Sequence, residues 1–159
     1  MDQKVTFPSG DLTLEGRVWL ATGSRGIGVV LCHPHPLRGG NMYSNVVSAV
    51  AEALWQHDIS TLRFNFRGTG ASTGVHGEGD TEGADVAAAV AYLLSCQPMA
   101  QLVVVGYSFG AGVGLMAGAA DARVTSLVGI APPVGRRDMS LLHTCTKAKL
   151  FVTGDQDHV

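Results

Sequence analysis

Cysteine, excess charge of one sign and long apolar runs are all scarce in this sequence of 159 residues. The three cysteines form no Cys-x-x-Cys pair, which argues against a disulfide framework or a cysteine-rich metal site. A formal net charge of −2 without a basic tract argues against a nucleic-acid partner. The apolar runs, such as residues 86–94, are far shorter than the ~20 residues of a membrane span, and the first ten residues lack a signal-peptide core. We therefore expect a cytoplasmic protein with no membrane partner.

Apolar runs and helical patterns alternate along the chain. Mostly continuous apolar runs, typical of strands covered on both faces, occupy residues 28–32, 60–66, 101–106, 126–131 and 149–154. Helical patterns lie at 43–56, 81–96 and 110–120. This alternation predicts an α/β fold with right-handed crossovers and a doubly wound, mostly parallel sheet. Residues 4–8 and 12–21 flank a Ser-Gly-Asp turn and predict an antiparallel N-terminal hairpin, so residues 1–159 are expected to form one domain.

The segment TGSRGIG, residues 22–28, has the glycine spacing of a short-chain dehydrogenase turn. Such a turn must open a helix whose N-terminus meets the cofactor pyrophosphate. Here a β-branched run closed by two prolines follows instead, and no tyrosine is followed by a lysine four residues later. We interpret this segment as a loop between strands and expect no nicotinamide cofactor.

Gly106, Ser108 and Gly110 form a Gly-x-Ser-x-Gly motif. Because the chain holds 21 glycines, the five letters prove little, and the context must decide. A valine-rich strand pattern precedes Ser108, and a helix pattern rich in small residues follows it. This context predicts a nucleophile elbow, in which flanking glycines relieve clashes around a strained serine. The alternative is an ordinary strand-to-helix turn.

Four ordered motifs, HPHPLRGGNMYSNVV, LRFNFRGTGASTG, GYSFGAG and GDQD, resemble small α/β hydrolases related to dienelactone hydrolases and serine carboxylesterases. The resemblance runs from about Leu12 to the end of the chain. It implies an α/β-hydrolase fold that cleaves a small-molecule ester and needs no metal or organic cofactor. The segment between residues 131 and 149 has room for one helix, so no lid domain is expected.

In such a site, Ser108 attacks an ester carbonyl, and two N–H donors stabilise the oxyanion. One donor is expected to be the backbone N–H of Phe109. The second comes from the loop HPHPLRGG, in which the prolines have no N–H. His35 is therefore the first choice and Leu37 the second.

The resemblance places the catalytic acid at Asp157, with Asp155 as the alternative. The family order is serine, acid, histidine, yet the sequence ends two residues after Asp157. His158 adjoins the acid too closely to be the expected base, and His143 precedes it. We therefore expect the printed sequence to lack the last strand and helix of the fold, with the catalytic histidine beyond Val159.

Other residues have two interpretations each. Arg67 and Leu37 are candidate substrate-binding residues, but Arg67 could instead tie its glycine-rich loop to a nearby acid. His33 and His35 could form a metal-binding His-x-His pair, but no His-x-His-x-Asp-His continuation follows, so we expect no metal there and keep a structural role open. His76 is expected to be an exposed loop residue.

Two functions besides ester hydrolysis stay open. One is a catalytically inactive binding or scaffold protein with a hydrolase fold. The other is a cofactor-free haloperoxidase-like activity that uses the same catalytic groups.

Overall fold

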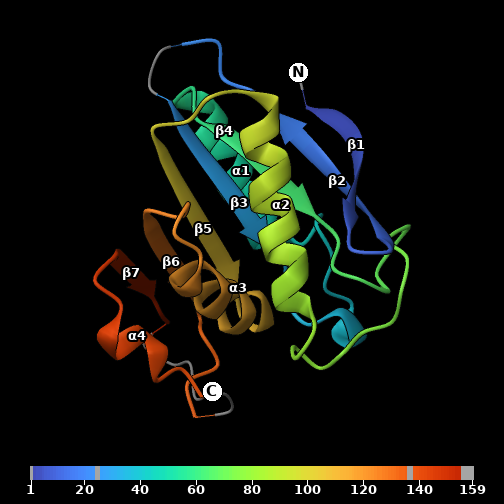
Figure 1. Cartoon of the computed structure of the whole chain (residues 1–159), viewed down its shortest axis with the longest axis vertical. Helices are drawn as coiled ribbons and strands as arrows, with labels where there is room; N and C mark the ends of the chain where they lie inside the picture. The colour runs from blue at the N-terminus through green and yellow to red at the C-terminus, as the bar shows by residue number, and fades with distance from the viewer. Residues whose placement is uncertain (1, 24–25, 136–137, 155–159) are drawn as a thin grey trace.

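The computed structural model describes residues 2–23, 26–135 and 138–154. Over these residues the chain forms a seven-stranded sheet with the order β1-β2-β4-β3-β5-β6-β7 (Figure 1). β1 (Gln3–Ser9) and β2 (Leu12–Trp19) form an antiparallel hairpin, and β2 continues the sheet antiparallel to β4. The predicted N-terminal hairpin is therefore confirmed at one edge of the sheet.

The central strands run parallel, as predicted from the alternating pattern. They are β3 (Ile27–Cys32), β4 (Ser60–Phe64), β5 (Gln101–Tyr107), β6 (Ser126–Ile130) and β7 (Ala148–Val152). The connecting helices are η1 (Pro36–Arg38), α1 (Asn45–Gln56), α2 (Glu82–Cys96), α3 (Phe109–Ala120) and α4 (Leu141–Thr144). The glycine-rich segment at residues 22–28 follows β2, which ends at Trp19, and its last two residues belong to β3, which agrees with a connection between two strands.

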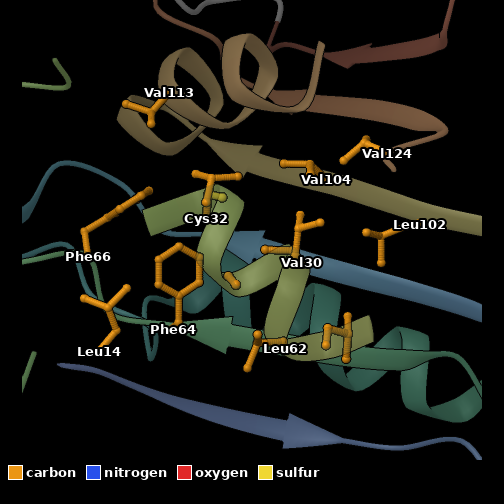
Figure 2. Packing of buried hydrophobic residues seen from close by; sticks show 14 of the residues in the cluster. Leu14, Val30, Cys32, Leu62, Phe64, Phe66, Leu102, Val104, Val113 and Val124 are labelled. Atoms are coloured by element: carbon orange, nitrogen blue, oxygen red, sulfur yellow. The ribbon is translucent and has the colours of Figure 1, made fainter. Parts of the chain in front are cut away.

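The helices cover both faces of the sheet. In Figure 1, α2 covers the near face of the sheet, and α1 lies behind it. Along β3, Val29 and Leu31 pack in the cluster with α1, whereas Val30 and Cys32 belong to the larger cluster with α2 and α3. Figure 2 shows part of this larger cluster. Successive strand residues point to opposite faces, so a strand covered on both sides needs an unbroken apolar run.

The segment after β6 contains one short helix, in agreement with the expected absence of room for a lid domain. α4 is one turn of four residues, so no lid lies between β6 and β7 in the described part of the chain. The side chains of Leu150, Phe151 and Val152 on β7 are about half exposed. No helix among the described residues combines the length and the apolar character needed to cross a membrane.

Candidate active site

Ser108 occupies a strained turn between the end of β5 and the start of α3. Its backbone has φ 52° and ψ −116°, a conformation that residues other than glycine rarely adopt. The Ser108 N–H donates to the carbonyl of Ile130 on β6 at 2.9 Å, which anchors the turn to the sheet. This strand-turn-helix geometry is that of a nucleophile elbow.

Gly106 and Gly110, on either side of Ser108, lie so close to neighbouring backbone atoms that a side chain would not fit at either position. A Cβ at Gly106 would collide with the backbone of Gly110 and Ala111 in the first turn of α3. A Cβ at Gly110 would collide with the carbonyl oxygens of Cys32 and His33 at the end of β3. The motif therefore lets α3 begin directly against the sheet.

The loop after β3 curls beside this elbow. The His35 carbonyl accepts hydrogen bonds from the N–H groups of Arg38 and Gly40, both at 3.0 Å. Gly39 has φ 81°, and a Cβ at Gly40 would collide with the carbonyl groups of residues 34 and 35. The two glycines thus permit a tight turn that carries His35 toward the elbow.

An open pocket of about 340 Å³ joins the elbow and this loop. It is lined by Pro34, His35, Arg38, Gly39, Gly40, Ser44, Asn45, Tyr107 and Ser108. The structure thus brings Ser108 and His35 to one pocket, whereas Leu37 lines a neighbouring pocket with Asn41 and Tyr43. Phe109 is the first residue of α3, and a helix N-terminus favours a developing negative charge.

Arg67 lies on a buried acid rather than in this pocket. Its Nε donates to Oδ2 of Asp85 at 3.0 Å, and its Nη2 donates to Oδ1 at 2.7 Å. Asp85 is fully buried in the first turn of α2 and also accepts from the Ser9 hydroxyl. These contacts fit the structural role considered for Arg67, in which it ties its glycine-rich loop to a nearby acid. A contact of Arg67 with substrate stays a prediction.

His33 and His35 point to different surroundings and form no metal-binding pair. His33 is fully buried, and both of its ring nitrogens contact backbone groups. His35 instead lies beside His76, with ring centroids 5.1 Å apart. Both rings also pack on Phe109, at 5.0 and 5.2 Å. Burial, followed by the charge of His76, lowers the pKa of His35.

The expectation that His76 is an exposed loop residue is wrong. Its side chain is 7% exposed because the loop that carries it folds back over Phe109. Glu82 in the first turn of α2 holds this loop by accepting hydrogen bonds from the N–H groups of Gly77 and Gly79, at 2.7 and 2.9 Å. The sequence did not lead us to expect a role for Glu82 and Asp85. The pattern that could have indicated one is two acids in the first turn of a helix directly after a glycine-rich loop.

Asp157, Asp155 and His158 lie outside the described residues. The assignment of Asp157 as the acid therefore stays a prediction.

A strained serine at a strand-to-helix turn, in a seven-stranded and mostly parallel sheet with an antiparallel hairpin, defines the class of protein as an α/β hydrolase. Residues 28–155 match the family described as Serine aminopeptidase, S33, and the chain belongs to this family.

Solved structures agree with this class. A Coxiella burnetii alpha-beta serine hydrolase homologue is 34% identical, with a TM-score of 0.87, over 100% of this chain and 76% of the other. XC6422 from Xanthomonas campestris, an a/b serine hydrolase without lid, is 34% identical, with a TM-score of 0.85, over 97% of this chain and 71% of the other. The Pyrococcus furiosus esterase Pf2001 is 26% identical, with a TM-score of 0.75, over 85% of this chain and 53% of the other.

Proposed function

We propose that this protein hydrolyses small carboxylic esters with Ser108 as the nucleophile. The Ser108 Oγ attacks the ester carbonyl, the alcohol leaves, and water then hydrolyses the acyl-enzyme. The backbone N–H groups of Phe109 and His35 stabilise the oxyanion, and Asp157 orients the histidine base. The observation that carries the proposal is the strained backbone of Ser108, with φ 52°, in a pocket that His35 also lines.

The pocket favours an ester over a peptide with a free amino terminus. None of the described residues that line it is acidic, and its charged side chain is that of Arg38. An aminopeptidase needs an acceptor for the substrate ammonium group, which an arginine would repel. The similarity to the Pyrococcus esterase supports the same choice. The open shape and the absence of a lid in the described chain favour short acyl groups.

The test compares Ser108→Ala with Ser95→Ala, which replaces an exposed serine on α2. In the full-length protein, Ser108→Ala should abolish labelling by a fluorophosphonate probe. It should also lower kcat/KM for p-nitrophenyl acetate by at least about a thousandfold, because the nucleophile is lost. Ser95→Ala should match the wild type in both measurements, and both variants should keep its thermal midpoint.

The outcomes separate the competing functions. A wild-type protein that neither reacts with the probe nor hydrolyses esters is a scaffold, and the proposal fails. Faster cleavage of an amino-acid p-nitroanilide than of the acetate would indicate a peptidase. Peroxide-dependent bromination that exceeds ester hydrolysis would indicate the haloperoxidase alternative.

A further inference from the structure

Two imidazoles and a carboxylate converge beside the elbow. His35 comes from the loop after β3, whereas His76 and Glu78 come from the loop between β4 and α2. One ligand atom from each residue lies within 4.8 Å of the other two. The Glu78 Oε2 is 3.8 Å from Nε2 of His35 and 3.7 Å from Nε2 of His76. Two loops that are far apart in the sequence thus present a shared set of metal-ligand atoms.

Several imidazole nitrogens of this cluster make no hydrogen bond with the described residues. His76 is more than nine-tenths buried, and neither of its ring nitrogens makes a hydrogen bond with the described residues. The Nδ1 of His35 is also buried without a hydrogen bond inside the described chain. Buried polar atoms almost always have a partner, so Nε2 of His76, which makes no hydrogen bond among the described residues and lies 3.7 Å from Oε2 of Glu78, points to a ligand that binds between the loops.

Glu82 stands where a supporting carboxylate is usually found. Its Oε1 lies 2.9 Å from Nδ1 of His76, although the two atoms are not aligned for a hydrogen bond. Histidines that bind metals typically direct their other ring nitrogen to a carboxylate, which fixes the tautomer and the ring orientation. Glu82 itself is held by the N–H groups of Gly77 and Gly79. This arrangement leaves Nε2 of His76 as the atom that faces His35 and Glu78.

We propose that His35, His76 and Glu78 bind a divalent transition-metal ion of the Zn²⁺ class. Two imidazoles and one carboxylate suit Zn²⁺, Co²⁺ or Ni²⁺, whereas Mg²⁺ and Ca²⁺ prefer oxygen ligands alone. Bonds of about 2.0–2.1 Å in a tetrahedral site place ligand atoms roughly 3.3 Å apart, with water as the fourth ligand. The side chain of Glu78 is 70% exposed, so it can make the small movement needed.

The ion would join the two loops above Phe109. Both imidazoles already pack on the Phe109 ring, and His35 belongs to the loop that lines the Ser108 pocket. Binding would therefore hold that loop against the one that carries His76. The role is structural, and binding does not depend on whether Ser108 acts on esters.

Isothermal titration of the EDTA-treated full-length protein with Zn²⁺ tests the proposal. One ion per chain should bind with a Kd of micromolar or below, and Co²⁺ should give the absorption bands of a tetrahedral site. His76→Gln and Glu78→Gln should each weaken binding by at least about tenfold, because each removes one ligand. His57→Gln, which replaces an exposed histidine at the end of α1, should bind as the wild type does.

Hydrogen exchange supplies a second readout. Zn²⁺ should slow amide exchange in residues 35–40 and 76–79 of the wild type, and should leave both segments of Glu78→Gln unchanged. Glu78 is mostly exposed, so this variant keeps its fold even where a change at buried His76 does not. The proposal fails if the wild type binds neither ion at 100-micromolar levels. It also fails if Glu78→Gln and His76→Gln both bind as tightly as His57→Gln.

Discussion

The Nε2 atom of His33 accepts a hydrogen bond from the backbone N–H of Phe66 at 3.1 Å. Its Nδ1 lies 2.7 Å from the Pro34 carbonyl oxygen. A carbonyl can only accept, so Nδ1 carries the proton and the imidazole is neutral. His33 thereby joins the chain just after β3 to the chain just after β4, and a second proton on Nε2 would break the bond to Phe66.

This bond predicts a pH-dependent stability. Burial lowers the pKa of His33 from 6.5 to about 4, and the nearby charge of His76 adds to the effect. A lowered pKa stabilises the fold above pH 6.5, and this contribution is lost as the pH falls toward 4. The shift corresponds to about 3 kcal/mol. Urea unfolding of the wild type between pH 7 and 4 should show this loss of unfolding free energy, in addition to the loss caused by protonation of Asp and Glu carboxylates.

His33→Gln isolates the contribution of the imidazole. A glutamine amide can also accept from Phe66 and donate to Pro34, but it does not titrate. The free energy of unfolding of this variant should therefore fall less steeply with pH than that of the wild type. Parallel pH profiles for the two proteins would contradict the assignment of a neutral, titrating His33.

Arg67→Gln should destabilise the fold by about 3–5 kcal/mol, because it leaves the buried Asp85 carboxylate without its charged partner. Arg123→Gln is the matched control, since Arg123 pairs with Asp121 at an exposed site and its loss should cost about 1 kcal/mol or less. Denaturant unfolding measures both values. If Arg67→Gln is as stable as the control but raises KM, the substrate-binding assignment is correct instead.

Gly110→Ala should disrupt the elbow, because the new methyl group meets the carbonyl oxygens of Cys32 and His33. We expect kcat/KM for p-nitrophenyl acetate to fall by about a hundredfold, since a small displacement of a nucleophile is costly. Gly83→Ala places the same methyl group in α2, where the nearest atom is 3.9 Å away. That variant should keep its activity and gain up to about 1 kcal/mol of stability. Equal activity of the two variants would contradict the close packing at Gly110.

Arg38 should favour esters whose acyl group carries a carboxylate, because it lines the Ser108 pocket. Arg38→Gln should lower kcat/KM for a p-nitrophenyl hemisuccinate by about two- to fivefold, the small effect expected of an exposed charge. The value for p-nitrophenyl acetate should not change. Added salt should reduce the preference in the wild type and have no effect in the variant. Identical preferences in the two proteins would show that Arg38 does not contact substrate.

Local pattern was sufficient for most of the fold and for the elbow. The unbroken valines of β5 require a sheet covered on both faces, and glycines on either side of Ser108 are the residues that a sharp turn against that sheet tolerates. Both features depend on neighbours within a few positions along the chain. A sequence pattern of that length can therefore identify them.

Contacts between distant segments were decided by the tertiary structure. Nothing near His76 in the sequence indicates that its loop folds over Phe109 and meets His35. The only histidine pair that spacing suggested was His33 with His35, which the sequence context argued against. Likewise, Arg67 could be assigned to substrate or to an acid until α2 placed Asp85 against it. Such partners are chosen by how loops pack across the ends of parallel strands, where neighbours in space are tens of residues apart in the chain. Hydrophobic periodicity determines the strands and helices, but it does not specify which polar side chains meet at their ends.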